Sequence, residues 1–191
     1  MRLKRAVFLD RDGTLNQDAG YTHRISDWIW LPGALAGLKR LREAGWLLVV
    51  VSNQSGIGRG YYVWQDLRKL EAWLNDQLAG MGLDIAGWYY CPHLPEAGCD
   101  CRKPAPGMLL KAAAELEIDL AASWMLGDKL SDIQAGLAAG CSCGLIASCG
   151  NGADIEGART IYPAVPVWPS LAAAAEAIIA ASSGQSARNF A

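Results

Sequence analysis

The chain has 191 residues, enough for one domain with a sizeable core, and its composition of 52% hydrophobic and 19% charged residues is ordinary for a globular protein. The formal net charge of -2 provides no basic field for a duplex, so we expect no nucleic-acid partner. The N-terminus lacks the apolar core of a signal peptide, and no apolar run approaches the roughly 18 residues of a membrane span. We therefore expect a cytoplasmic protein with no membrane partner.

Short apolar runs alternate with segments of helical periodicity, which is the pattern of a parallel sheet covered by helices. The runs expected as strands are residues 6–9, 47–51, 88–91, 124–126 and 144–147. The helices are expected around Leu35 to Leu41 and Leu67 to Leu78, and over residues 106–117 and 129–139. We predict an α/β fold with a doubly wound, mainly parallel sheet, in a single domain over residues 1–181 followed by a flexible tail over residues 182–191.

Polar residues follow the expected strands where each strand ends. Asp10 follows the first run, Ser52 the second and Asp128 the fourth. In open parallel sheets the site lies beyond the carboxyl ends of the strands, so we expect these side chains to converge on one crevice. A second acid, Asp12, stands two residues after Asp10. Because neighbouring carboxylates repel each other, this pair indicates a functional need.

These acids, the Ser52 hydroxyl and Lys103 resemble the groups that transfer a phosphoryl group to an aspartate. An aspartate that attacks a phosphate brings two anions together, which costs about 4 kcal/mol per unit-charge pair at roughly 4 Å and an effective dielectric of about 20. A divalent cation held by Asp10 and Asp128, together with Lys103, would offset this repulsion. Oxygen ligands and a phosphate favour Mg²⁺ as that cation.

The segments FLDRDGT, VVVSNQSG, CRKP and GDKLSD, in this order and at strand ends, resemble the four motifs of the haloacid-dehalogenase superfamily of phosphatases. The resemblance covers about residues 6 to 147 and implies the Rossmann-like fold of that superfamily. It also implies that Asp10 is the nucleophile. Asp12 would be the acid/base that protonates the leaving group and then activates water, and it would offer Mg²⁺ its backbone carbonyl.

The resemblance gives roles to the remaining motif residues as well. Ser52 and Lys103 would bind the phosphoryl oxygens, and Asp128 would hold Mg²⁺ with Asp10. Lys129 would lie near the substrate. Asp132, one helical turn beyond Asp128, would support the site.

A second group of metal-ligating residues precedes the third motif, in CPHLPEAGCDCRKP. It offers four soft or borderline ligands, which would fill all four coordination positions of a tetrahedral Zn²⁺ and leave none for water or substrate. This pattern predicts a zinc site that is structural rather than catalytic. The ligands are Cys91, His93, Cys99 and Cys101. The metal would fix a loop with little core of its own and so position Arg102 and Lys103, which follow directly.

The other three cysteines, Cys141, Cys143 and Cys149, lack this spacing and a histidine. We interpret them as small buried apolar residues or inert thiols. With no export signal, a disulfide framework is not expected.

Many members of the superfamily carry a cap domain inserted after the first or second motif. Only 39 residues separate Asp12 from Ser52, and 50 separate Ser52 from Lys103, so we expect a capless enzyme. The choice of substrate then falls to three loops, residues 16–31, 53–62 and 91–103.

The capless form with a zinc loop resembles two groups, the D-glycero-D-manno-heptose 1,7-bisphosphate 7-phosphatases and the histidinol-phosphate phosphatases. Segments such as NQDAGYTHRISDW and MLGDKLSDIQAG look like the heptose enzymes, whereas the short gap between His93 and Cys99 also looks like the histidinol group. The favoured reading is a monomeric Mg²⁺-dependent phosphatase that removes the 7-phosphate of the heptose bisphosphate in lipopolysaccharide precursor synthesis.

An enzyme for a bisphosphate needs a cationic residue that binds the second phosphate, and Arg102 and Arg59 are the candidates. The full set of residues expected to bind a small phosphorylated sugar is Asp18, Ala19, Gly20, Tyr21, Asn53, Gln54, Ser55, Arg59, Arg102 and Lys129.

Two readings from other classes stay open. A phospho-acceptor signalling domain also uses an aspartate, a hydroxyl and a lysine, but Asp12 argues against it because an acid/base beside the nucleophile serves to discharge the intermediate. A nucleic-acid end phosphatase would use stacking aromatics, and Tyr61, Tyr62 and Trp64 form an aromatic cluster. The acidity of the chain disfavours this second reading.

Overall fold

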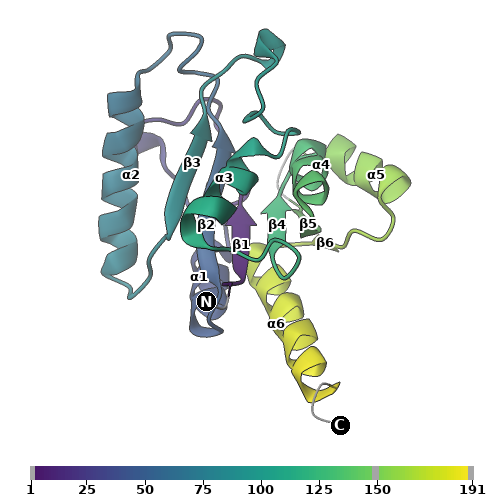
Figure 1. Ribbon diagram of the computed structural model, residues 1–191. Helices are drawn as coiled ribbons and strands as arrows, with labels where there is room; N and C mark the ends of the chain where they lie inside the picture. Colours follow the sequence, from purple (N-terminus) through teal and green to yellow (C-terminus); the bar gives the residue numbers. More distant parts are fainter. Residues whose placement is uncertain (1–2, 148–150, 189–191) are drawn as a thin grey trace.

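The computed structural model describes residues 3–147 and 151–188 (Figure 1). Within them, one sheet contains six strands in the order β3-β2-β1-β4-β5-β6, and all neighbouring strands are parallel. The strands are β1 (Ala6–Leu9), β2 (Leu47–Asn53), β3 (Gly87–Cys91), β4 (Trp124–Gly127), β5 (Ser142–Ile146) and β6 (Val167–Trp168). The helices are α1 (Ala34–Glu43), α2 (Trp64–Ala79), α3 (Gly107–Leu116), α4 (Leu130–Ala139), α5 (Gly152–Ile161) and α6 (Leu171–Arg188), with short 3-10 turns η1 (Ile25–Asp27) and η2 (Pro95–Ala97).

Helices cover both faces of the sheet, which makes the fold doubly wound. Val7 and Leu9 of β1 pack into one apolar cluster with residues of α1, α2 and α6. Ala6 and Phe8 of the same strand face the other cluster, which includes residues of α3 and α4. Because both faces of β1 are buried, the strand reads as a continuous apolar run rather than an alternating one. The predicted fold class is confirmed.

The strand order determines where along the edge of the sheet the predicted crevice lies. β1 lies between β2 and β4, and the order of strands along the chain reverses between β1 and β4, so the loops beyond these strands diverge. The carboxyl ends of β1 and β3 point to the top of Figure 1, where the loop that carries η2 also lies. In the described residues, the segments that follow β1 and β2 consist of loops and the turn η1 before the next helices begin, so they hold no cap domain.

The C-terminal third departs most from the sequence prediction. The strand β6 was not predicted, because two residues are too few to show a period. The helix α5 was not predicted either. The helix α6 continues to Arg188, so the expected tail from residue 182 begins inside a helix, and its flexibility stays a prediction.

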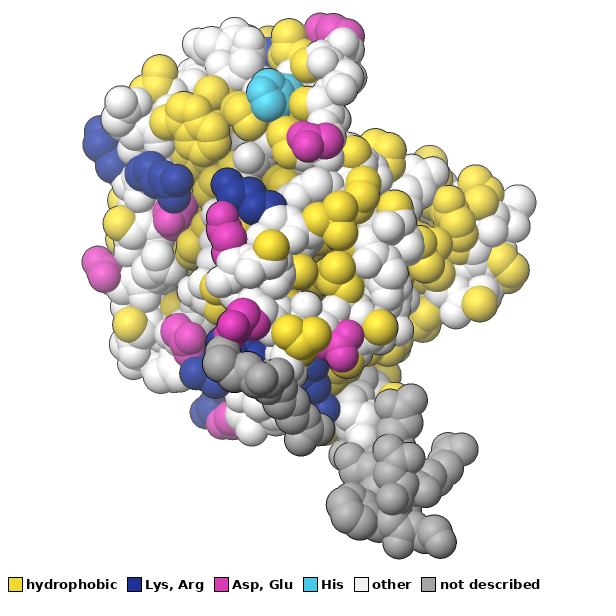
Figure 2. Space-filling view, in the orientation of Figure 1, with side chains coloured by type: hydrophobic (Ala, Val, Ile, Leu, Met, Phe, Trp, Pro, Cys, Tyr) yellow, Lys and Arg dark blue, Asp and Glu magenta, His cyan; other side chains and the backbone are white. Residues whose placement is uncertain are grey.

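The surface gives two further observations. In the part of the chain that is described, no helix has both the length and the apolarity that a bilayer crossing needs. On the face drawn in Figure 2, Lys and Arg side chains are interspersed with Asp and Glu, and hydrophobic side chains gather at the upper end beside a histidine.

Candidate active site

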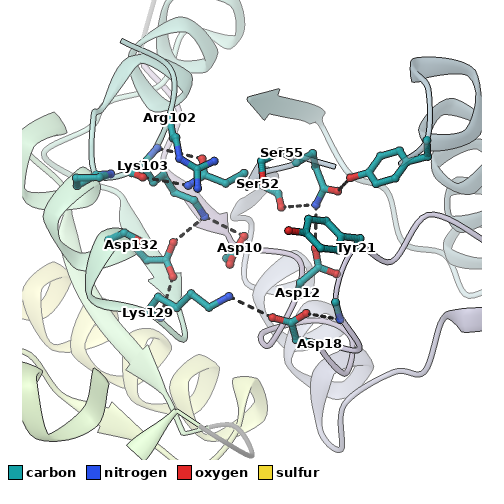
Figure 3. A pocket seen from close by; sticks show the side chains of 16 residues that line it. Asp10, Asp12, Asp18, Tyr21, Ser52, Ser55, Arg102, Lys103, Lys129 and Asp132 are labelled. Carbon is teal, nitrogen blue, oxygen red and sulfur yellow. Dashed lines mark hydrogen bonds and ion pairs between the residues drawn. The ribbon is translucent and has the colours of Figure 1, made fainter. Parts of the chain in front are cut away.

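The sheet register brings the strand-end residues together. Leu9 of β1 is paired with Val50 of β2 on one side and with Leu126 of β4 on the other. The next residue, Asp10, donates its backbone N–H to the carbonyl of Leu126 at 2.9 Å. Asp10 is therefore level with the end of β4, while β2 continues two residues further to Asn53. Asp10 lines a cavity of about 610 Å³ at this edge of the sheet (Figure 3).

Lys103 lies buried between two of the acids. Its Nζ is 2.8 Å from Asp10 Oδ1 and 2.6 Å from Asp132 Oδ1, and it donates to the carbonyl of Val51 at 2.9 Å. Burial acts to lower the pKa of Lys103, but the charges of Asp10 and Asp132 outweigh it and raise that pKa. Burial raises the pKa of Asp10, and Lys103 opposes the rise. The lysine is thus a fixed cation directly beside the expected nucleophile.

Asp10, Asp128 and Asp132, which we call the carboxylate cluster, could hold a metal ion, since one oxygen from each lies within 4.8 Å of the others. Burial, followed by the charges of Asp10 and Asp132, raises the pKa of Asp128 to about 8. Gly13, at φ 85°, lies against the Asp128 carboxylate, where a Cβ would collide with it. This close approach is why the residue after Asp12 is a glycine.

Within the carboxylate cluster, Asp132 already has partners for both oxygens. One oxygen meets Lys103, and the other accepts the backbone N–H of Lys129 at 3.0 Å, as part of the cap of α4. Asp10 and Asp128 are then the side chains suited to a shared cation, and Asp132 orients Lys103.

Asp12 points away from the carboxylate cluster. Its Oδ2 accepts from Arg11 Nη2 and from Gln54 Nε2, each at 2.8 Å, and its Oδ1 accepts from Asn16 Nδ2 at 2.9 Å. Arg11 is 0% exposed, and it also donates to the carbonyl of Thr22. The expectation that the Asp12 side chain does not bind the metal stays a prediction. Sequence reasoning missed Arg11, because an arginine between two acids gives no local sign of whether it faces solvent or the interior.

Asn53 and Arg102 act on the loop that carries Lys103. Asn53 Nδ2 donates to the carbonyl of Lys103, and Asn53 Oδ1 accepts the N–H of Lys103, both at 3.0 Å. Arg102 Nη1 donates to the carbonyl of His93 at 3.1 Å. The side chain of Asn53, expected to bind substrate, is therefore engaged in holding the backbone of Lys103.

Most of the expected site residues line the cavity. They are Asp10, Asp12, Asp18, Gly20, Tyr21, Ser52, Asn53, Gln54, Ser55, Arg102, Lys103 and Lys129. Asp128 lies next to the cavity, because one of its oxygens is within 4.8 Å of an oxygen of Asp10, which lines the cavity. The exposed residues Ala19 and Arg59 are not among the described residues that line it, and their role stays a prediction. The structure adds Tyr62, Pro104 and Ser131 to the lining, which also includes Asp132, the residue expected to support the site.

The four expected zinc ligands also converge. The three Sγ atoms of Cys91, Cys99 and Cys101 are 3.3 to 3.6 Å apart, and His93 Nδ1 lies 3.6 Å from Cys91 Sγ and 3.2 Å from Cys101 Sγ. Ligands about 2.3 Å from a tetrahedral zinc are about 3.8 Å from one another, close to this spacing. The arrangement therefore fits the ion.

The remaining cysteines differ from this group. Cys141 and Cys143 are buried, and burial raises the pKa of each thiol to about 12, as expected for inert thiols. Cys149 lies outside the described residues.

The fold and the site together define a hydrolase of the haloacid-dehalogenase class, and comparisons with known proteins agree. The HAD-hydrolase-like family matches residues 100–174. D-glycero-β-D-manno-heptose-1,7-bisphosphate 7-phosphatase of Yersinia pestis is 45% identical over 159 residues, which cover 80% of this chain and 85% of the relative. The enzyme of that name from Escherichia coli K12 is 48% identical over 141 residues, covering 70% and 74% of the two chains.

A solved structure supports the same assignment. The D,D-heptose 1,7-bisphosphate phosphatase from B. bronchiseptica, complexed with magnesium and phosphate, is 38% identical with a TM-score of 0.84, and the match covers 92% of this chain and 98% of that one. The chain belongs to the family of D-glycero-β-D-manno-heptose-1,7-bisphosphate 7-phosphatases. The superfamily predicted from the four motifs and the heptose group favoured within it are thereby confirmed, and the protein is a phosphoric monoester hydrolase.

Proposed function

We propose that the protein removes the 7-phosphate of D-glycero-D-manno-heptose 1,7-bisphosphate through a phosphoaspartate on Asp10, as a Mg²⁺-dependent step in lipopolysaccharide precursor synthesis. The observation that carries the proposal is the pairing of Asp10 with the buried Lys103 at the floor of an open cavity. The names of the relatives supply the sugar, and they favour it over histidinol phosphate and over a signalling domain.

The chemistry follows from the positions of the side chains. Asp10 attacks phosphorus while Asp12 gives a proton to the leaving sugar oxygen, and Asp12 then takes a proton from the water that hydrolyses the phosphoaspartate. Lys103 and Ser52 bind the phosphoryl oxygens, where negative charge must be stabilised. Asp132 and Asn53 keep Lys103 in place for both steps.

The carboxylate cluster fits Mg²⁺, because three buried acids share one buried lysine and the pKa of Asp128 is raised by its neighbours. Asp10 and Asp128 would hold the ion, together with the backbone carbonyl of Asp12. When bound, it supplies positive charge that offsets the repulsion between Asp10 and the phosphate. A second ion, Zn²⁺ at the Cys/His group, would have a structural role.

Recognition of the second phosphate is assigned to Arg102. Its side chain lines the cavity beside Lys103, and its bond to the carbonyl of His93 ties it to the zinc loop. On the opposite wall, Lys129 Nζ lies 3.2 Å from Asp18 Oδ2, which leaves a charged pair to contact the sugar hydroxyls. A monomeric state, a cytoplasmic location and the lack of nucleic-acid and membrane partners stay predictions.

The test is phosphate release over a panel of heptose 1,7-bisphosphate, fructose 1,6-bisphosphate, histidinol phosphate and a 3′-phosphorylated oligonucleotide. We expect the highest kcat/KM on the heptose bisphosphate, with release of one phosphate per sugar. Faster turnover of histidinol phosphate, or of the oligonucleotide, would overturn the substrate assignment while leaving the phosphatase class intact. A stable phosphoprotein without release would contradict the hydrolytic mechanism.

A further inference from the structure

The amide of Gln54 connects the groups that act on the phosphate. Its Nε2 donates to Asp12 Oδ2 at 2.8 Å and to Ser52 Oγ at 2.9 Å. Its Oε1 accepts from Tyr62 Oη at 2.5 Å and from Arg11 Nη2 at 3.2 Å. One side chain therefore bonds to the expected acid/base and to a residue expected to bind the phosphoryl group.

The direction of these bonds is set by Arg11. A guanidinium has only donors, so the oxygen of Gln54, and not its nitrogen, must face Arg11. The nitrogen then faces Asp12 and Ser52. Because that nitrogen can only donate, Ser52 Oγ must accept, and its own hydrogen is left to point into the cavity that Ser52 lines.

The hydroxyl of Tyr62 is constrained in the same way. Oε1 of Gln54 can only accept, so Tyr62 must donate. Tyr62 is 4% exposed, and its ring stacks on His23 with centroids 4.6 Å apart and planes 8° from parallel. A Cβ at Gly56 would collide with this ring, so the loop after β2 closes tightly over it. Burial raises the pKa of Tyr62 to about 12, so the hydroxyl keeps its hydrogen at neutral pH.

We propose that Tyr62 is a positioning residue for the phosphatase reaction: together with Arg11 it locks the amide of Gln54, which aims the hydroxyl of Ser52 at the phosphoryl group and holds Asp12. This inference rests on the proposed function and deepens it. It also gives a role to one member of the aromatic cluster noted in the sequence. Tyr62 serves the site through its hydroxyl, and not as a stacking surface for a base.

The consequence for catalysis is specific. Without the Tyr62 hydroxyl, the oxygen of Gln54 keeps one of its two donors, so the amide is held less firmly in the orientation that Arg11 sets. An amide that moves from this position would no longer direct the Ser52 hydroxyl and Asp12 in a fixed geometry. Substrate binding through Arg102 would be unaffected, so the loss should fall on kcat rather than on KM.

The experiment is a double-mutant cycle between Tyr62→Phe and Gln54→Ala, measured with the Mg²⁺-loaded full-length protein. Tyr62→Phe keeps the ring and its stacking on His23. We expect it to lower kcat about tenfold, with KM changed by less than about twofold. In the Gln54→Ala background, the same change should have almost no further effect on the residual rate.

The matched control is Tyr89→Phe, which also removes one tyrosine hydroxyl bond, here to Glu115 on the surface and away from the cavity. Its kcat should equal that of the wild type. If Tyr62→Phe lowered kcat equally in both backgrounds, or left kcat unchanged, the relay through Gln54 would be wrong. A loss of kcat accompanied by a large drop in Tm would show a structural role and would also overturn the inference.

The assay separates this inference from the function on which it rests. Each variant is measured on the heptose bisphosphate and on 4-nitrophenyl phosphate, which tests phosphatase chemistry without the sugar. Suppose that the wild-type protein turns over both substrates and that the kcat losses of Tyr62→Phe and Gln54→Ala are additive in the double mutant. This result would overturn the inference and leave the proposed function intact. No wild-type release from either substrate would overturn the proposed function, and the inference with it.

Discussion

The carboxylate cluster and the segment of residues 91–103, which we call the Cys/His loop, both gather groups that could bind a metal, but the chain builds them differently. The cluster is buried, and its members follow β1 and β4 or lie in α4, so elements with their own apolar core position each side chain. In the loop, His93 and residues 95–98 are exposed. Its regular structure is Cys91, which ends β3, and the short turn η2.

This difference separates two uses of a metal. The sheet and Lys103 already hold the carboxylate cluster in place, so a cation there serves the chemistry. The Cys/His loop buries too little apolar surface to offset the entropy of ordering its residues, so a cation there serves the fold. Lys103 is the last residue of the Cys/His loop and contacts the carboxylate cluster. Its side chain pairs with Asp10 and Asp132, and its backbone N–H donates to Asn53 at the end of β2.

The largest effect should come from the nucleophile of the carboxylate cluster. Asp10→Asn should lower phosphate release by more than about a thousandfold, because an amide cannot form the phosphoaspartate. The fold should persist, since the strand that precedes residue 10 is unchanged. The measurement is steady-state phosphate release with thermal unfolding as a check. The control is Asp84→Asn, which changes an exposed acid paired with Arg42 outside the three substrate loops. Release by Asp10→Asn near the wild-type rate would refute the covalent mechanism.

Neighbouring cations on the Cys/His loop should separate kinetically. Lys103→Ala should lower kcat on every substrate by roughly a hundredfold, because Lys103 binds the phosphoryl that is transferred. Arg102→Ala should mainly lower kcat/KM for the bisphosphate, by about 1.5–3 kcal/mol if one charged contact is lost, and should spare a monophosphate.

The readout of this pair is the ratio of kcat/KM between the two kinds of substrate. Lys111→Ala, which removes an exposed lysine of α3, is the control. Equal losses on bisphosphate and monophosphate for Arg102→Ala would mean that Arg102 shapes the loop without binding the second phosphate.

Removal of a loop ligand should have a smaller effect on turnover. Cys99→Ser should lose the zinc and raise KM for the bisphosphate roughly tenfold, equivalent to about 1.4 kcal/mol, because Arg102 is tied to His93. The kcat should fall less, since Lys103 is held from the sheet side. Metal analysis together with kinetics tests this, and Cys141→Ala should keep its zinc. Full affinity in zinc-free protein would remove the structural role of the ion.

The last effect falls on stability rather than on turnover, and it concerns protons and Mg²⁺ at the carboxylate cluster. The pKa of Asp128 is raised from 3.8 to about 8, so ionisation of this group destabilises the metal-free fold as pH rises through that range. Mg²⁺ binds the ionised form, so its stabilising effect should grow with pH below about 8, by about 1.4 kcal/mol or about 3–5 °C in Tm per unit.

Thermal unfolding with Mg²⁺ and with a chelator, at pH 6, 7 and 8, measures this difference. Asp128→Asn should abolish its dependence on pH. A Mg²⁺ effect on Tm that is constant from pH 6 to 8 would contradict the assigned role of Asp128.

Much of the site was predictable because its signals are local. Asp10 and Ser52 directly follow an apolar run, and Asp128 follows one after Gly127. Parallel strands carry the residues after them to one edge of a sheet. The zinc ligands were predictable because all four lie within a span of eleven residues, 91–101, so their spacing alone brings them together. The prediction that Arg59 and Asn53 bind substrate has less support. The structure leaves Arg59 exposed and outside the cavity lining, and the Asn53 side chain bonds to the backbone of Lys103.

The sequence by itself determined the alternation of strands and helices, the residues at each strand end and the spacing of the ligands, because these are properties of short segments. Only the tertiary structure decided that Arg11 turns inward, that Lys103 lies between Asp10 and Asp132, and that Tyr62 bonds to Gln54. Most of these contacts join different elements, and each depends on where a side chain points once those elements are packed. Because such directions are set by packing and not by residue type, no local pattern could reveal them.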